Sequence, residues 1–357
     1  MTLRLATAGE SHGPALVAIL TGLPAGLVLD REAIDADLER RQEGYGRSPR
    51  QQIEQDRVEV LAGLRHGRTL GTPLALVVRN ADHKNWTWGM SPWPPEGEPQ
   101  GKGTKPVTLP RPGHADLAGV LKYGLGDVRD ALERASARHT AVHVAAGGVA
   151  KALLAAIGVE VAGSVLDEQA LRERVDAARA ERDTVGGVVE VRAQGVPPGL
   201  GSYAAKEDRL DARLAAAVMG IQAVKGVEIG EGFALAGRRG SEAHDEIRTD
   251  RRRDTNRAGG IEAGVSNGEE IVVRAAMKPL PTLMKPLASV DLATGEPAQA
   301  LVERSDVAAV EALAVVAEAA VAWELARAAR EKFGGDAIGD FVAAWRAYLE
   351  RIDWHRL

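Results

Sequence analysis

The sequence predicts a mixed α+β fold. Short segments rich in β-branched residues, such as Leu74–Val78, are typical of strands. Alanine-rich segments, of which Asp306–Lys332 is the clearest, are typical of helices. The expected strands do not alternate strictly with long helices, and this order favours an α+β fold over a doubly wound parallel sheet. The small side chain of alanine also allows helices to pack closely, as in a central helical layer.

Four strands and one helix are expected in the first eighty residues. The strands are Leu3–Ala8, Ala15–Leu20, Val58–Leu61 and Leu74–Val78. A turn at Gly9–Gly13 separates the first two strands, and Asp30 offers an N-cap for a helix from Arg31 to about Glu43.

Asp82–Pro112 is expected to be a long loop. It contains three tryptophans together with several prolines and glycines, and it shows no periodicity. Loops of this length inside a compact domain are usually functional or mobile.

The rest of the chain predicts four more strands, at Val159–Val165, Gly187–Ala193, Val224–Ala236 and Glu270–Ala276. Helices are expected between the first two of these strands and at Leu210–Ile221, Asp306–Lys332 and Ala337–Leu349. The alanine-rich segment Asp127–Ile157 predicts either one long helix or two helices that meet at Gly147-Gly148.

Composition limits the class of protein. The chain has 357 residues, of which 45% are hydrophobic, and no linker or repeat divides it, so a single domain is expected. The balance of 45 basic and 50 acidic side chains argues against a nucleic-acid-binding protein. The absence of cysteine excludes disulfides, cysteine-ligated metals and thiol nucleophiles.

Targeting and nucleotide-binding signals are also missing from the sequence. Neither a signal peptide nor an apolar run of about 20 residues is present, so a cytoplasmic protein outside the membrane is expected. A G-x-G-x-x-G fingerprint after a strand and a Walker loop are both absent. A nucleotide cofactor would therefore need a site of another kind.

Two histidines lie in glycine-containing turns. His12 lies within Gly9–Gly13, directly after an expected strand, where the backbone can approach a ligand closely. His114 lies within Arg111–Asp116, where proline and glycine define a turn. The plainer alternatives are a turn histidine bonded to a carbonyl and, for Asp116, a residue at the start of a helix. The presence of two such histidines favours a functional role.

Arginines are concentrated in two segments. Arg134 and Arg138 are four residues apart and would share one helix face, where their charges repel unless an anion lies between them. A second group contains Arg40, Arg41, Arg47 and Arg50 around Gly44–Gly46. This density exceeds what a helix C-terminus needs, so an anion site is expected. The alternatives are a solvated basic face and a simple interaction with the helix dipole.

Further candidate residues lie near these arginines and later in the chain. His139 and His143 have a spacing that can hold a metal, although no third ligand is evident. The glycine-rich segment Asn256–Gly268 is expected to leave backbone N–H groups free for an anion or a planar ring. Lys278–Thr282 adds an amine and a hydroxyl, and Asp306 opens an expected helix. Together, these features indicate a site for one or two highly anionic ligands with acid–base groups nearby.

In this order, the segments resemble those of the chorismate synthase family over nearly the whole chain. The matching segments are Gly9–Gly13, Arg111–Asp116, Arg134–Thr140, Gln222–Phe233 and Asn256–Gly268. The resemblance implies a β-α-β sandwich with a central helical layer between antiparallel sheets, assembled as a homotetramer. It also implies a 1,4-anti elimination of phosphate from 5-enolpyruvylshikimate-3-phosphate (EPSP), which gives chorismate in the shikimate pathway to aromatic amino acids.

The family reaction requires reduced FMN although it causes no net redox change. In the family, the flavin transiently supplies an electron as phosphate leaves and then takes up the substrate proton. The resemblance implies that His12 protonates the leaving phosphate, that His114 protonates or stabilises the reduced flavin, and that Asp306 helps flavin N5 to act as the base. The arginines expected to bind anions are Arg41, Arg47, Arg111, Arg134 and Arg138.

The resemblance also assigns the flavin contacts. These are Arg134, Ala135, Ser136, Gln222, Ala223, Ala263, Lys278, Pro279, Leu280, Pro281, Thr282 and Arg304. Four positions depart from the family pattern: His139 replaces a usual Glu, His143 a frequent Arg, Ala263 a usual Gly, and Ser305 a His found in some members. None of these departures involves the three residues expected to act in catalysis.

With 357 residues, the chain is expected to leave no room for a fused flavin reductase. Reduced FMN is therefore expected from a separate reductase, with NADPH as the indirect reductant, and neither a nucleic acid nor a membrane is expected as a partner. The loop Asp82–Pro112 is expected to close over the ligands. Two other functions stay open: a non-catalytic anion-binding protein that uses the same arginines, and a metal-dependent hydrolase that uses His139 and His143.

Overall fold

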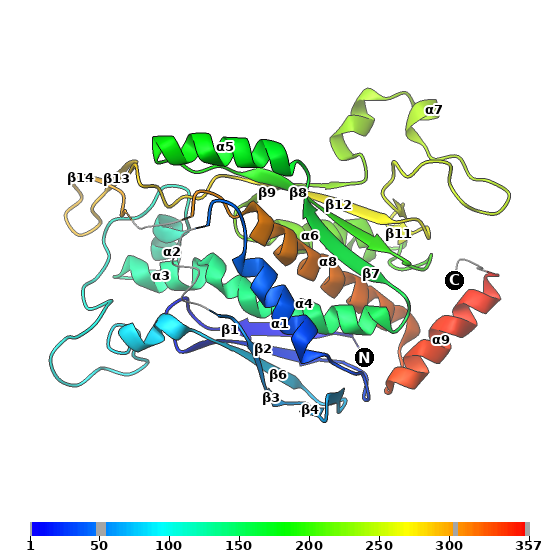
Figure 1. The fold of residues 1–357 in the computed structure, drawn as a ribbon, viewed down its shortest axis with the longest axis horizontal. Coiled ribbons are helices and arrows are strands. Elements are labelled where there is room, and N and C mark those ends of the chain that lie inside the picture. Colours follow the sequence, from blue (N-terminus) through cyan, green and yellow to red (C-terminus); the bar gives the residue numbers. More distant parts are fainter. Residues whose placement is uncertain (1, 48–54, 303–305, 354–357) are drawn as a thin grey trace.

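The computed structural model describes residues 2–47, 55–302 and 306–353. In these residues, two four-stranded antiparallel sheets enclose a layer of helices (Figure 1). The first sheet has the order β1-β2-β6-β3, with strands at Arg4–Ala8, Ala15–Thr21, Leu74–Arg79 and Val58–Ala62. The second has the order β7-β8-β12-β9, with strands at Glu160–Val165, Gly187–Gln194, Ile271–Met277 and Val224–Ile229. The predicted α+β class is confirmed.

The helical layer joins the two sheets. It is built mainly from α1 (Arg31–Gln42), α4 (Thr140–Ala155) and α8 (Val310–Phe333). Helix α4 packs along α8 and against β2 and β6 of the first sheet, whereas α8 packs against β7 and β8 of the second. Helix α6 (Leu210–Met219) adds to the layer by packing against α8 and β9. As predicted, Asp30 caps α1 through its side chain.

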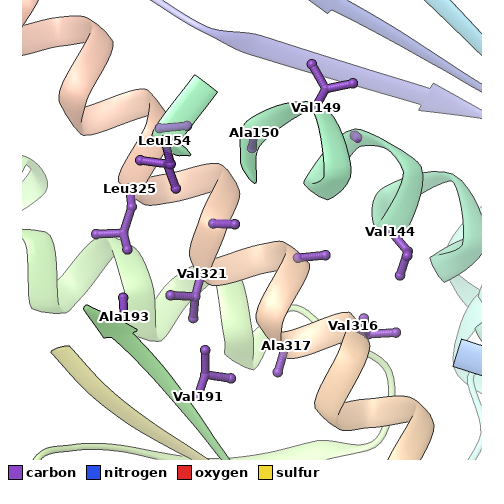
Figure 2. Packing of buried hydrophobic residues seen from close by; sticks show 14 of the residues in the cluster. Val144, Val149, Ala150, Leu154, Val191, Ala193, Val316, Ala317, Val321 and Leu325 are labelled. Atoms are coloured by element: carbon purple, nitrogen blue, oxygen red, sulfur yellow. The ribbon is translucent and has the colours of Figure 1, made fainter. Parts of the chain in front are cut away.

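Small residues allow α4 and α8 to lie in close contact, as the side chains of this core show (Figure 2). A Cβ atom on Gly147 of α4 would lie only 2.3 Å from the Cβ of Ala319 in α8. On another face of α8, a Cβ on Gly163 of β7 would lie 2.3 Å from the carbonyl oxygen of Ala314. Any larger residue at either glycine would push the helix away from its neighbour.

One ionic cluster lies inside this layer. Glu318 of α8 is 2% exposed and accepts hydrogen bonds from Arg40 of α1 (2.9 Å), Lys151 of α4 (2.7 Å) and the N–H group of Gly163 (2.9 Å). Burial opposes the ionisation of Glu318, but these partners outweigh it and lower its pKa. The cluster therefore ties α1, α4, α8 and β7 together with its buried charge compensated.

The break in the alanine-rich segment lies at Ser136, so the prediction of one long helix or a junction at Gly147-Gly148 is wrong. Helix α3 covers Val128–Ala135, the 3₁₀ turn η3 covers Ala137–His139, and α4 follows directly. Ser136 has extended backbone angles (φ −61°, ψ 140°), and its hydroxyl caps η3. Gly147 lies inside the helix. Close packing, rather than backbone flexibility, explains why this position has no side chain.

Two other predicted boundaries also need correction. Strand β9 ends at Ile229, and the backbone then turns through Gly230 and Gly232, both with positive φ, into the 3₁₀ helix η5. Helix α8 begins at Val310 rather than at Asp306. Residues 306–309 form neither helix nor strand, and Val307 donates a hydrogen bond to the carbonyl of Gly46 (2.8 Å).

The remaining elements complete the described structure. Helices α5 and α9 match predicted helices, whereas most of the others are too short for a pattern in the sequence to predict. The helices are α2 (Asp116–Tyr123), α5 (Glu168–Glu181), α7 (Gly240–Ala243) and α9 (Ile338–Arg351), with 3₁₀ helices η2 (Ala81–Asn85), η4 (Lys206–Asp208) and η5 (Gly232–Gly237). The strands are β4 (Leu64–Arg65), β5 (Arg68–Thr69), β10 (Ile261–Glu262), β11 (Val265–Ser266), β13 (Ala288–Val290) and β14 (Pro297–Gln299).

The predicted loop Asp82–Pro112 begins inside the 3₁₀ helix η2, and its remainder agrees with the structure, because residues 86–115 contain neither helix nor strand. No helix in the described residues combines the length and the apolar character that a membrane span requires.

We predict that Gly147→Ala destabilises the protein. The added methyl group would overlap Ala319, and overpacking of this kind costs about 1–3 kcal/mol. Gly339→Ala in α9 is the matched control, because a Cβ there meets no atom within 4 Å and alanine is the better helix former. Urea denaturation followed by circular dichroism measures both free energies of unfolding. Equal stabilities of the two variants would contradict the close contact of α4 and α8.

Candidate active site

His12 lies in the turn between β1 and β2, where Glu133 of α3 holds it. The Glu133 carboxylate accepts hydrogen bonds from the backbone N–H of His12 (2.8 Å) and from its Nδ1 atom (2.8 Å). The Trp86 ring stacks on the imidazole, with 4.0 Å between the ring centroids. His12 is therefore held in one orientation by a carboxylate at its edge and an aromatic ring on its face.

The C-terminal end of α3 brings this carboxylate to the turn. Asp127 caps the start of α3 by accepting a hydrogen bond from the N–H of Arg129 (2.9 Å), and the extended backbone of Ser136 ends the helix. The N–H of Ser11 donates to the carbonyl of Glu133 (3.1 Å), and the Ser11 and Ser136 hydroxyls lie 3.2 Å apart. The whole end of the helix is thus attached to the β1–β2 turn.

Arg134 and Arg138 do not share a helix face, so that prediction is wrong. Arg134 belongs to α3, and its guanidinium donates to the carbonyl (3.2 Å) and the hydroxyl (3.0 Å) of Thr7. Arg138 belongs to η3 and pairs with Asp56 at 2.6 Å. The two side chains diverge because Ser136 between them is extended.

A cluster of cations surrounds Asp56. Arg41 of α1 is 6% exposed, donates to the hydroxyl of Thr140 (2.9 Å) and lies 3.3 Å from Asp56. Burial, together with repulsion from Arg138 and Arg47, lowers the pKa of Arg41 to about 10, although Asp56 opposes this change. Positive charges held together away from water favour an anionic ligand.

Arg47 and Asp306 form an ion pair beside this cluster. Their closest atoms are 2.7 Å apart, and their side chains are only 12% and 10% exposed. Burial lowers the pKa of Arg47. The Nε atom of Arg47 is buried and has no hydrogen-bond partner among the described residues. Because an unpaired buried donor is costly, an acceptor atom from a ligand would stabilise this arginine.

His139 and His143 meet at the start of α4, with their Nε2 atoms 3.0 Å apart. The Thr7 hydroxyl lies 3.1 Å from Nε2 of His139, and the Gln222 amide lies 3.4 Å from its Nδ1. Burial, with repulsion from His143 and Arg134, lowers the pKa of His139 to about 3, and burial also lowers that of His143. Both rings are therefore neutral at neutral pH.

These two histidines do not gather a third ligand in the part of the chain that the structure describes. No group of three His, Cys, Asp or Glu side chains in these residues has the arrangement needed to hold a metal ion. Their described polar neighbours are a hydroxyl and an amide, which are weak ligands for zinc.

A second histidine–carboxylate group lies at the start of α2. Asp116 is completely buried and accepts hydrogen bonds from the backbone N–H and the Nε atom of Arg111, both at 2.9 Å, and from Nδ1 of His114. Burial alone would raise the pKa of Asp116, but the hydrogen bonds from His114 and Arg111 hold it well below its usual range. His114 is thus held through Nδ1 by a buried carboxylate, as His12 is.

Lys278, directly after β12, connects the turn that carries His114 to Ala223, just before β9. Its ammonium donates to the carbonyl of Gly113, and its backbone N–H donates to the carbonyl of Ala223 (2.9 Å). Ala223 is the neighbour of Gln222, which contacts His139. The described contacts therefore lead without a gap from the turn that carries the second histidine to the start of α4.

The predicted flavin residues fall into three groups. Those on or beside this path are Arg134, Ala135, Ser136, Gln222, Ala223, Lys278, Pro279, Leu280, Pro281 and Thr282. Ala263 lies apart, at the turn of the β10–β11 hairpin, with φ +50°. A glycine would adopt this angle with less strain than alanine does. Arg304, like Ser305 and Arg50, lies outside the described residues.

The backbone amides of Asn256–Gly268 are used within the protein at several positions, so the prediction that they are free is wrong there. The N–H groups of Arg257 and Ala258 donate to the Asp245 carboxylate, both at 2.9 Å. The N–H of Gly260 donates to the Asn256 side chain (2.8 Å). Polar side chains, rather than a ligand, hold this part of the segment.

Sequence reasoning missed the acidic partners of the site. Glu133 follows the buried Leu132 and lies four residues after Arg129, so its position on the inner face of an amphipathic helix was the available signal. Asp56 is 3% exposed and pairs with Arg41 and Arg138, but it precedes β3 in an irregular segment where no local pattern marks it.

Known proteins resemble this chain over nearly its whole length. The family model for chorismate synthase matches residues 3–329. The chorismate synthase of Desulforudis audaxviator (strain MP104C) is 52% identical, with 99% of both chains covered. That of Symbiobacterium thermophilum is 53% identical, with 98% of this chain and 99% of the relative covered. A crystal structure of chorismate synthase superposes with a TM-score of 0.78 at 35% identity, covering 99% of each chain.

We predict that acid destabilises the protein partly through His139 and His143. In the unfolded chain both protonate near pH 6.5, whereas the folded protein holds His139 neutral down to about pH 3. The unfolded state therefore binds more protons in this window, and the free energy of unfolding falls as the pH drops through it. Thermal unfolding at several pH values measures the effect.

The double variant His139→Gln/His143→Gln should lose less stability than the parent between about pH 7.5 and 5. His244→Gln, which replaces an exposed histidine, is the control and should keep the parent's pH dependence. If the double variant and the parent lost stability equally, the two histidines would not be the neutral buried pair described above.

Proposed function

Because the chain belongs to the chorismate synthase family, we propose that it catalyses the 1,4-anti elimination of phosphate from EPSP to give chorismate. This makes it a lyase of the shikimate pathway to aromatic amino acids. One observation of the site itself supports the proposal most directly. Two histidines, each held through Nδ1 by a buried carboxylate, lie on a continuous set of contacts with a cluster of cations. The comparisons support neither the anion-binding protein nor the metal-dependent hydrolase.

The cationic cluster suits the substrate. EPSP carries a phosphate and two carboxylates, and Arg138 and Arg47 both lie close enough to repel Arg41. A bound anion would relieve this repulsion, and the unpaired Nε of Arg47 would gain an acceptor. Arg111 and Arg134 complete the proposed anion-binding set, and both orient their guanidinium groups through contacts with the protein.

We further propose reduced FMN as the cofactor. The donor set fits this group, because Arg134 and Lys278 supply cations, Gln222 an amide and Thr282 a hydroxyl, from segments that the described contacts bring together. When bound, reduced flavin supplies the electron-rich ring that lets phosphate leave without net oxidation of the substrate. The residues of the chain bind, orient and shield it.

The proposed catalytic roles belong to three residues. His12, at the β1–β2 turn, protonates the departing phosphate, and Glu133 and Trp86 hold its ring for this transfer. His114 protonates or stabilises the reduced flavin, with its ring oriented by the buried carboxylate beside it. Asp306, paired with Arg47, assists removal of the substrate proton.

The proposal also covers the assembly of the enzyme, its location and the source of its reduced cofactor. We propose a single-domain chain that assembles as a homotetramer in the cytoplasm and receives reduced FMN from a separate reductase that uses NADPH. We also propose that the loop 82–112 closes over the ligands. The stacking of Trp86 on His12 supports this, because it places the start of the loop at the catalytic turn.

The activity is tested by an anaerobic assay of the purified protein with EPSP and chemically reduced FMN. Chorismate and phosphate should appear in equal amounts, without net oxidation of the flavin, and oxidised FMN should support no turnover. If EPSP and reduced FMN both bind but no chorismate forms, the proposed function is wrong.

We predict that His12→Ala and His114→Ala each lower kcat/KM by roughly 10²- to 10⁴-fold, as expected for the loss of a group that exchanges protons. His244→Ala, at an exposed position, should keep the parent's rate. Initial rates over a range of pH values check the prediction. A His12 or His114 variant that kept the parent's rate at every pH would exclude the role proposed for that residue.

A further inference from the structure

Glu133 is a buried acid whose presence is explained neither by the turns that carry His12 and His114 nor by the expected ligand contacts. Its side chain is 1% exposed. Three hydrogen bonds join it to residues 11 and 12: its carbonyl accepts from the N–H of Ser11 (3.1 Å), and its carboxylate accepts from the N–H and from Nδ1 of His12 (both 2.8 Å). A residue with a purely structural role at this turn would need only the backbone contacts.

The contact with Nδ1 decides which ring nitrogen takes part in chemistry. An ionised carboxylate only accepts hydrogen bonds, so Nδ1 of His12 carries a proton in this arrangement. The nitrogen that exchanges a proton with a ligand is then Nε2. The second oxygen of the carboxylate lies 3.1 Å from the same Nδ1, so both oxygens keep the ring edge in place.

The negative charge of Glu133 acts in the same direction. His12 must be an imidazolium before it gives a proton to phosphate, and a carboxylate in direct contact stabilises that cation. Trp86 covers one face of the ring and restricts its tilt. The carboxylate is not buried alone, because a guanidinium nitrogen of Arg129 lies 3.6 Å from it.

Other charged or titratable groups also face this turn. The His83 ring donates to the carbonyl of His12 (2.9 Å), and Asp82 accepts a hydrogen bond from the Trp86 indole (2.9 Å). Lys102 pairs with Asp82 at 3.1 Å. These contacts are with the His12 backbone, with Trp86 and between Lys102 and Asp82, whereas the Glu133 carboxylate bonds directly to the His12 ring.

We propose that Glu133 is the positioning residue for His12: it selects the ring nitrogen that delivers the proton and stabilises the protonated ring. This inference rests on the proposed function, in which His12 protonates the leaving phosphate. Glu133 acts through the ring of His12, so it needs no contact of its own with substrate or flavin.

Glu133→Gln is the informative variant, because glutamine keeps the length and an acceptor oxygen but removes the charge. We expect kcat/KM for EPSP to fall on the order of 100-fold, mainly through kcat. We also expect activity on the alkaline side to be lost at lower pH than in the parent, since the imidazolium is less stable without the carboxylate. Asp130→Asn, at an exposed acid on the same helix, is the matched control and should change neither quantity.

A double-mutant cycle separates positioning from a structural role. If Glu133 acts through His12, Glu133→Gln should cost less than about threefold when it is added to His12→Ala. An undiminished loss in that background would overturn the proposal, because the effect would not pass through His12. An unchanged rate and pH profile of Glu133→Gln alone would also overturn it.

Nitrogen-15 NMR of the histidine side chains gives a readout that needs neither turnover nor a stable variant at position 133. The His12 signal is identified by its loss in His12→Ala, and in the parent it should report a protonated Nδ1. A parent with unprotonated Nδ1 would refute the inference. Failure of the parent to make chorismate in the anaerobic assay would instead refute the proposed function, which the NMR result cannot do.

Discussion

The close contact between α4 and α8 is the constraint on which the rest of the structure depends. These helices form the middle of the sandwich, and each packs against a different sheet, so their separation sets the separation of the sheets. Gly147 against Ala319 and Gly163 against Ala314 show how little space is left. Dispersion and apolar burial favour such contact, and the small side chains lose little rotamer entropy in making it. The buried Glu318 cluster then connects the helices through charges that are compensated.

The same helix that fills the core also delivers the candidate site. Because α4 is fixed against both its neighbours, the short break before it at Ser136 has a defined position near the first sheet. On one side of the break, Glu133 reaches the β1–β2 turn. On the other, Arg138 reaches Asp56. The break in the helix thus lets side chains of neighbouring sequence reach two different parts of the site.

Charge in the site is organised in two ways. Around Arg41, burial together with repulsion from Arg138 and Arg47 outweighs the attraction of Asp56, and the pKa of this arginine is lowered as a result. Around His12 and His114, a buried carboxylate holds each ring through Nδ1. His139 and His143 contact each other as neutral rings. This pair therefore adds no charge to the site near neutral pH.

The sequence by itself determined the class of fold, most of the long helices and strands, and the turns that carry His12 and His114. These depend on local properties: periodicity, β-branched runs, the cap at Asp30 and glycine in turns. Resemblance to a family added the expected roles of residues, because motif order is also written in the sequence. The tertiary structure decided those features that local sequence patterns do not predict. Three features depend on contacts between residues far apart in the chain: the helix break at Ser136, the start of α8 after Asp306, and the acidic partners Glu133 and Asp56. Local sequence preferences do not specify which distant residue will make such a contact.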